Sequence, residues 1–101
     1  MKVIVFGSNG LVGSSICKYF SQDENITLHA STRKDTNLFS LEQTKTTINN
    51  FTPDVIINAA AKVGGIVANN TLRTEFILEN LKININILES CIENSNIKII
   101  N

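Results

Sequence analysis

The chain alternates between short apolar runs and longer segments with helical spacing. Three segments, which begin near residues 11, 40 and 72, place apolar side chains three and four residues apart and predict helices. The apolar runs between them are typical of buried strands. Strands that alternate with helices predict a parallel, doubly wound α/β sheet. The strands are predicted at residues 2–6, 26–30, 55–58 and 97–100.

The apolar positions of each helix predict the face that packs on the sheet. Ser40 is placed to cap the second helix. The third helix, from about Leu72 to Glu93, carries two adjacent stripes that make one wide face for packing on a sheet. The stripe of the first helix consists of Val12, Ile16, Tyr19 and Phe20, and that of the second of Leu41, Thr44, Ile48 and Phe51. The third helix carries Ile77, Leu81, Ile85, Leu88 and Ile92 on one stripe, and Phe76, Asn80, Ile83, Ile87 and Cys91 on the other.

Two strand orders fit this alternation of strands and helices. In the first, four strands form half of a Rossmann-type sheet plus the strand beyond its topological switch, in the spatial order 3-2-1-4. The alternative is a flavodoxin-like order, and periodicity alone does not separate the two. We predict the Rossmann-type order, with flanking helices.

Composition and charge narrow the class of protein. With 101 residues the chain is at most one domain, and its zero formal charge removes the usual electrostatic case for nucleic acid or an anionic membrane. No segment reaches the ~20 apolar residues of a membrane span. The opening MKVIVFGSNG has the pattern of a buried strand and not of a signal peptide. Cys17 and Cys91 suggest reduced thiols, so we expect a cytoplasmic protein.

A glycine-rich turn, GSNGLVG, follows the first strand and opens the first helix with the spacing G-x-x-G-x-x-G. Gly7 allows a sharp turn, Gly10 lets the backbone approach a pyrophosphate, and Gly13 lets the helix pack close to the strand. The N–H groups and positive dipole end of the helix then face the phosphates, which predicts a dinucleotide site. The alternative is a turn that binds no ligand. The predicted cofactor-binding residues are Gly7, Ser8, Asn9, Gly10, Leu11, Val12 and Gly13.

The residues after the second strand predict which dinucleotide binds. NAD-binding folds carry an acid about 20 residues after the turn, where it holds the ribose 2′-hydroxyl. Here the strand leads into Arg33 and Lys34, and a cation at that place favours a 2′-phosphate, hence NADP. Two alternatives stay open. Asp35 would reach the ribose after a shift of two residues, or the two cations are solvated loop charges.

Four stretches together resemble a known family. GSNGLVG, STRKDTNLFS, NAAAKVGGIVANNT and EFILENLKININIL are similar to the N-terminal part of the GDP-L-fucose synthase family. This family belongs to the NAD-dependent epimerase/dehydratase enzymes of the extended short-chain dehydrogenase/reductase superfamily. The resemblance covers essentially all 101 residues, and AAAKVGGIVANN is its most specific part. It implies that residues 1–101 are the N-terminal part of an NADP-binding Rossmann domain.

The resemblance also implies a function and further site residues. The family reduces and epimerises a GDP-linked 4-keto-6-deoxyhexose with NADPH, and tends to form homodimers. By resemblance, Arg33 holds the adenosine 2′-phosphate, while Asn37 and Leu38 lie beside the adenine. Asn80 matches a supporting asparagine behind the active site. The small residues over which the cofactor passes are Ala59, Ala60 and Ala61.

The loop after these alanines and the long helix complete the expected site. Gly64 and Gly65 let the loop turn beside the nicotinamide and the sugar. Lys62 faces a phosphate or the substrate, or is a solvated loop lysine. Asn70 or Thr71 caps the long helix.

No catalytic residue is predicted. The catalytic groups of the family follow the fourth strand, so the resemblance implies a fragment that lacks them. Tyr19, His29 and the two cysteines do not match these groups. The alternatives are a non-catalytic NADP-binding module and a fragment of another nucleotide-sugar epimerase or dehydratase. A receiver-type domain is disfavoured because such domains carry acids after the first strand, where this chain has glycine, serine and asparagine.

Overall fold

The computed structural model describes residues 1–60, 70–94 and 96–101, without the side chains of residues 70–73. The apolar runs and periodic segments form the predicted strands and helices, with ends shifted by up to three residues. No helix in these ranges is long and apolar enough to cross a membrane. The elements are β1 (Lys2–Phe6), α1 (Leu11–Phe20), β2 (Thr27–Ser31), α2 (Leu41–Phe51), β3 (Val55–Asn58), α3 (Asn70–Ser90) and β4 (Lys98–Ile100).

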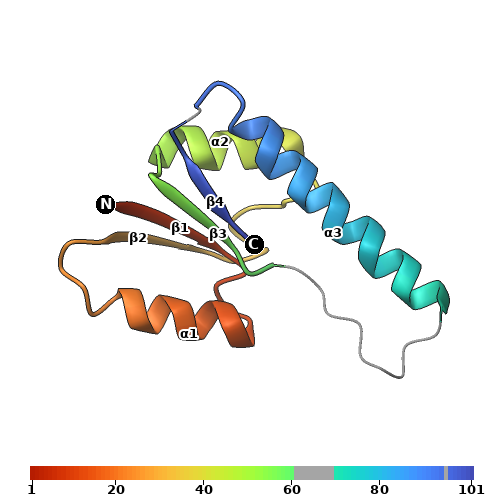
Figure 1. Cartoon of the computed structure of the whole chain (residues 1–101), viewed down its shortest axis with the longest axis horizontal. Coiled ribbons are helices and arrows are strands. Elements are labelled where there is room, and N and C mark those ends of the chain that lie inside the picture. Colours follow the sequence, from red (N-terminus) through yellow and green to blue (C-terminus); the bar gives the residue numbers. More distant parts are fainter. Residues whose placement is uncertain (61–69, 95) are drawn as a thin grey trace.

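The four strands form one parallel sheet in the order β2-β1-β3-β4 (Figure 1). The predicted doubly wound parallel sheet is therefore confirmed, but the order 3-2-1-4 is wrong. β3 pairs with β1, where Val5 lies opposite Ile57, and not with β2. Over these four strands the observed order is that of the flavodoxin-like alternative, within a Rossmann-like doubly wound sheet. The point where the strand order reverses consequently lies between β1 and β3.

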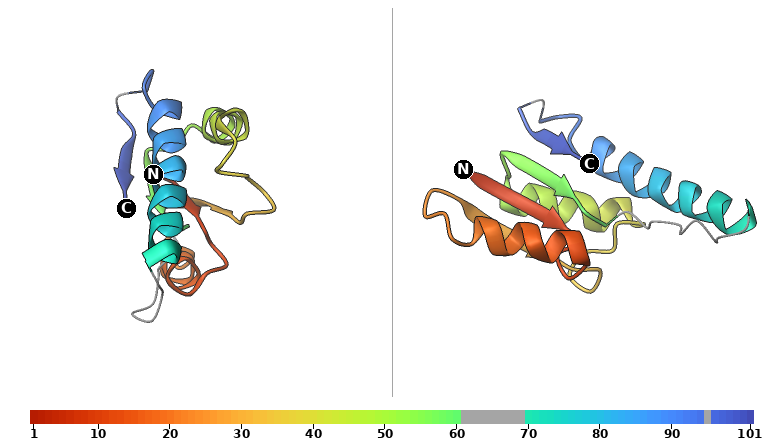
Figure 2. Two further views of the ribbon diagram at one scale, coloured as in Figure 1. Left: turned by 90° about the vertical axis from the view of Figure 1, so that its right-hand side faces the viewer. Right: turned by 60° about the horizontal axis from the view of Figure 1, so that its bottom comes forward.

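The strand order follows from where the helices pack. α1 covers one face of the sheet, while α2 and α3 cover the other (Figures 1 and 2). Crossovers between parallel strands are right-handed, so a helix on the second face carries the chain back past β1 and adds β3 on its far side. Ile48 of α2 is fully buried against Ile4 of β1 and Ile56 of β3, which fixes this crossover. Local periodicity contains no information about which edge a strand joins.

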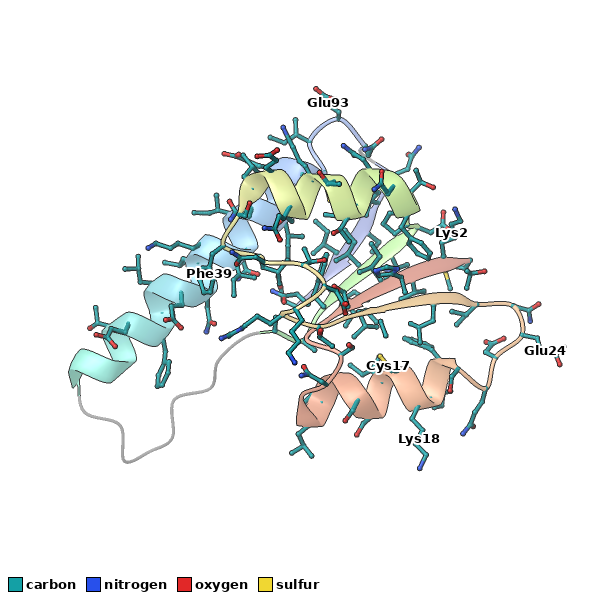
Figure 3. The ribbon with its side chains drawn as sticks, turned by 180° about the vertical axis from the view of Figure 1, so that it is seen from behind. Lys2, Cys17, Lys18, Glu24, Phe39 and Glu93 are labelled. Carbon is teal, nitrogen blue, oxygen red and sulfur yellow. The ribbon has the colours of Figure 1, made fainter. Side chains whose placement is uncertain are left out.

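α1 packs through a face that only partly matches the predicted stripe, since Ile16 and Phe20 face inward but Val12 and Tyr19 do not. Gly13 is its buried residue, and Val12 and Tyr19 of the predicted stripe are 63% and 74% exposed. The helix approaches the sheet most closely at Gly13, so the positions three, four and seven residues later face inward. Cys17 accordingly points toward the sheet, whereas Lys18 points away (Figure 3). The inward face thus consists of Gly13, Ile16, Cys17 and Phe20.

α3 buries one of its two predicted apolar stripes. Ile83, Ile87 and Cys91 are buried against the sheet and α2. The other stripe is exposed, so the prediction that both stripes pack is wrong for the described residues. The Asn70 end of α3 extends beyond the edge of the sheet, as Figure 1 shows. The exposed stripe consists of Ile77, Leu81, Ile85, Leu88 and Ile92.

α2 begins with the predicted cap. The Ser40 hydroxyl oxygen accepts a hydrogen bond from the Gln43 backbone N–H at 3.2 Å. Thr44 and Ile48 bury the inner face, and the helix ends at Thr52 in the left-handed conformation, with φ 52°. The position of α2 matters for the site, because α2 anchors one end of the loop between β2 and Ser40, which contains the predicted site residues Arg33, Asn37 and Leu38.

Replacing Ser40 with alanine is expected to lower the free energy of unfolding by about 1 kcal/mol, because the Gln43 N–H loses its acceptor. Urea unfolding followed by circular dichroism would measure the loss. Ser40→Asn is the matched control, since asparagine caps as well as serine. Equal midpoints for the two variants would contradict a stabilising role of the cap.

Candidate functional site

A cavity of about 170 Å³ opens where the carboxyl ends of β1, β2 and β3 meet. This is the edge and the strand-order reversal at which open α/β sheets bind ligands. The cavity is smaller than a complete small-molecule pocket of ~300–1,000 Å³, so it suits one end of an extended ligand. Phe39, which lines it, lies near α3 and well away from Lys2 (Figure 3). The predicted site residues that line it are Gly7, Asn9, Gly10, Arg33, Asn37, Leu38, Ala59 and Ala60.

The remaining predicted site residues lie elsewhere. Ser8 and Gly13 belong to the turn but do not line the cavity, and the side chains of Leu11 and Val12 are exposed on the first turn of α1. The cavity is also lined by residues that the sequence analysis did not predict. One of these is Thr36, which lies between the predicted residues Arg33 and Asn37. The predictions that fall outside the described residues or side chains concern Ala61, Lys62, Gly64, Gly65, Asn70 and Thr71.

The three glycines of the turn differ in why glycine is needed. Gly7 has φ 74°, and a side-chain carbon there would lie 2.6 Å from the carbonyl of Ala59. A side-chain carbon at Gly13 would overlap the Gly7 carbonyl oxygen. At Gly10 the nearest atom of the chain would be 3.4 Å away, which is ordinary contact. Gly7 and Gly13 are therefore required by the fold itself, while Gly10 leaves open space at the cavity wall.

The N-terminus of α1 offers hydrogen-bond donors at this cavity. The first N–H groups of a helix have no intrahelical acceptor. Gly10 is the N-cap and has no side-chain oxygen to accept from them, and the first turn contains no acidic residue. These donors and the positive end of the helix dipole suit a phosphate group. A pyrophosphate beside Gly10 thus fits the residues present.

Arg33 lines the cavity, whereas Asp35 does not. The Asp35 carboxylate accepts from the backbone N–H of Thr32 at 2.9 Å and from the Thr32 hydroxyl at 3.0 Å. The backbone hydrogen bond, followed by that of the hydroxyl, holds the pKa of Asp35 below its usual value. Asp35 instead borders a separate opening beside His29 at the outer side of β2. Of these two side chains, the structure thus places only Arg33 at the cavity.

The loop after Arg33 is fixed by hydrogen bonds to both helices on this face. The Gln43 side-chain oxygen of α2 accepts from the backbone N–H of Asn37 at 3.0 Å. The Asn86 amide of α3 donates to the Leu38 carbonyl at 2.7 Å. Asn37 and Leu38 are thus held at the cavity by the protein alone.

A buried amide fixes the end of β3. Asn58, 7% exposed, donates to the side-chain oxygens of Asn84 at 2.9 Å and of Asn101 at 3.3 Å. Its own oxygen accepts from the Ala60 N–H at 3.1 Å, which places Ala59 and Ala60 over Gly7. Asn84 of α3 thus contacts β3, and it lies one turn after Asn80, the residue predicted as a support. Asparagines on helices are usually solvated, so the sequence carried no signal for this contact.

The other reactive side chains do not assemble a catalytic centre in the described residues. Burial raises the pKa of both Cys17 and Cys91, which keeps these thiols protonated. His29 packs its ring 5.2 Å from that of Phe51 and does not line the cavity. No group of three or more histidine, cysteine or acidic residues that could hold a metal occurs in the part of the chain that the structure describes.

Comparisons with known proteins point to one family. Residues 3–101 match the model of the NAD dependent epimerase/dehydratase family. The chain is 37% identical over 93 residues to GDP-L-fucose synthase of Escherichia coli K12, covering 92% of this chain and 29% of the relative. It is 38% identical over 96 residues to GDP-L-fucose synthase of Dictyostelium discoideum, covering 90% and 29%.

A solved structure agrees with the sequence comparisons. A GDP-L-fucose synthetase from Naegleria fowleri bound to NADP superposes with a TM-score of 0.68 at 29% identity. The superposition covers 89% of this chain and 29% of that one. The chain thus spans under a third of the length of these relatives.

Proposed function

The chain belongs to the NAD-dependent epimerase/dehydratase family, and we propose that it is the NADPH-binding portion of an epimerase/reductase of the GDP-L-fucose synthase type. The observation that carries the proposal is the cavity at the reversal of strand order, where the glycine turn, Arg33 and the Ala59–Ala60 backbone meet. These are the parts that a 2′-phosphorylated dinucleotide needs: pyrophosphate donors, a cation for the ribose phosphate and an uncrowded path between them.

Each part has one task in the proposed complex. The N-terminal N–H groups of α1 bind the pyrophosphate, and Gly10 leaves room for it. Arg33 binds the 2′-phosphate through charge-assisted hydrogen bonds. Asn37 and Leu38 border the adenine, and the small residues Ala59 and Ala60 let the cofactor pass along the end of β3.

The chemistry of the proposed enzyme divides between cofactor and protein. NADPH supplies a hydride to the 4-keto carbon of a GDP-linked sugar when bound. Residues 1–101 orient the cofactor for this transfer, and we assign no proton-transferring group among them. The GDP-linked substrate is a proposal that rests on the relatives, which are GDP-L-fucose synthases. The homodimer of the full-length enzyme is a proposal that rests on the family resemblance alone.

Binding of the cofactor to the 101-residue chain tests this function directly. NADPH is expected to raise the midpoint of thermal unfolding, because a ligand at 100 times its Kd adds about 2.7 kcal/mol to stability. NADH at the same concentration should raise it less. Titration calorimetry would give both Kd values. A cooperative unfolding transition that neither cofactor shifts, with no heat of binding, would contradict the proposal.

A further inference from the structure

Three hydroxyl groups form a chain beneath the loop that carries Arg33. The Thr36 hydroxyl oxygen lies 2.9 Å from that of Ser31, at the end of β2, and 2.8 Å from that of Thr47, on α2. Ser31 and Thr36 are 1% and 2% exposed. A buried hydroxyl is costly unless it is hydrogen-bonded, and an apolar side chain would fill the same space without that requirement. The chain of hydroxyls therefore stabilises one particular arrangement of this loop.

The chain of hydroxyls ends at the carbonyl around which the loop turns. If Thr47 donates to Thr36 and Thr36 to Ser31, the Ser31 hydroxyl donates to the Thr32 carbonyl oxygen, which lies 3.5 Å away. In this order every hydroxyl proton has an acceptor. The same carbonyl oxygen accepts from the backbone N–H groups of Asp35 and Thr36, both at 3.0 Å. The hydroxyl chain thus connects α2 and β2 to the turn at residues 32–36.

A second set of bonds closes the turn from outside. The Asp35 carboxylate accepts twice from Thr32, as described above, but this contact is exposed to solvent. Solvent competes for exposed hydrogen bonds, so the buried hydroxyls are the stronger constraint on the turn. Arg33 belongs to this turn, between Thr32 and Thr36 in the sequence, and lines the cavity.

We propose that Thr36 is a positioning residue for cofactor specificity: its hydroxyl holds the turn at residues 32–36 so that Arg33 faces the cavity before any cofactor binds. The proposal rests on the NADPH-binding function proposed above. A pre-ordered turn lowers the cost of fixing Arg33 on the 2′-phosphate. Thr36 itself touches no phosphate in this scheme and acts only through the turn.

Loss of the Thr36 hydroxyl should weaken the binding of NADPH and leave the binding of NADH nearly unchanged. Only NADPH carries the 2′-phosphate, whereas both cofactors share the pyrophosphate at the glycine turn. That turn is held through backbone atoms and not through the hydroxyl groups, by the Ser8 N–H on the Ser31 carbonyl at 3.1 Å and by the Ala59–Ala60 backbone beside Gly7. Loosening residues 32–36 therefore leaves the shared part of the site in place.

Thr36→Val removes the hydroxyl and keeps the shape of the side chain, so it tests the proposal. We expect a roughly three- to tenfold loss of NADPH affinity by calorimetry, the range of one hydrogen bond. NADH affinity should change by less than about twofold. Thr36→Ser keeps the hydroxyl and should restore the NADPH:NADH ratio. Thr46→Val is the matched control on α2, since within the described residues the Thr46 hydroxyl bonds to the Glu42 carbonyl alone.

The other outcomes are equally informative. An equal loss for both cofactors, or no loss, would show a merely structural Thr36 and overturn the inference alone. If the unaltered chain binds neither cofactor, the proposed function fails and this inference with it. If Thr36→Val does not fold, Thr47→Val is the second test, because it removes the half-buried hydroxyl that bonds to Thr36. This variant should show the same loss of affinity for NADPH and not for NADH. An unchanged ratio in Thr47→Val would then overturn the proposal.

Discussion

Replacing Gly13 with alanine is expected to destabilise the chain by about 3 kcal/mol, the upper end of the usual cost of overpacking. The new methyl group would overlap the Gly7 carbonyl oxygen and lie 2.8 Å from its carbon, and backbone atoms cannot rotate away. Alanine favours helix over glycine by up to about 1 kcal/mol, which is too little to offset the clash. Urea unfolding would measure the loss as a lower midpoint.

Gly10→Ala is the control that separates folding from binding. Its methyl group would meet only the Gly7 carbonyl oxygen at 3.4 Å, and the backbone of Gly10 is extended, with φ −77°. We expect a stability change below about 1 kcal/mol, as for other N-cap replacements. NADPH binding should nevertheless fall, because the methyl group occupies the space proposed for the pyrophosphate. If Gly13→Ala proved as stable as Gly10→Ala, the close approach of α1 would be refuted.

Arg33→Ala is expected to weaken NADPH binding by roughly 10- to 100-fold. Hydrogen bonds to a charged group contribute about 1.5–3 kcal/mol, and 1.4 kcal/mol is a factor of ten in affinity. NADH lacks the 2′-phosphate, so its Kd should change by less than about twofold. Calorimetric titration with both cofactors would show the two effects.

Lys34→Ala is the matched control for the loss of a positive charge. Lys34 follows Arg33 directly, is exposed and does not line the cavity. Long-range electrostatic attraction would act on both residues alike, and would also weaken with added salt. Should Lys34→Ala reduce NADPH affinity as much as Arg33→Ala, Arg33 would contribute only general positive charge and not direct binding.

Much of the fold was predictable because its signals are local. The apolar run at residues 55–58 became β3 without any shift, and Ser40 caps α2 as its sequence context indicates. The strand order was not predictable in this way, since it depends on where α2 packs. The exposed face of α3 was not predictable either, because both of its stripes are apolar and only the position of the sheet distinguishes them.

The candidate site, like the fold, could be predicted from the sequence only in part. The spacing of the glycine turn and the cation after β2 were visible in the sequence, and the structure brings Gly10 and Arg33 to one cavity. The supporting residues were not visible. Thr36 in a polar loop and Asn84 on a helix are residue types that are usually solvated at such positions. Only the tertiary fold buries Thr36 and pairs Asn84 with Asn58.

The contact between Gly7 and Ala59 has a consequence for the order of events during synthesis. The first βαβ unit is complete in sequence at Ser31, but the glycine turn rests on the backbone of Ala59 and Ala60. A nascent chain that has not yet exposed residue 60 therefore lacks one wall of the cavity. Because the proposed NADPH site requires segments distant in sequence, we expect the cofactor to stabilise the chain late in folding, chiefly by slowing its unfolding.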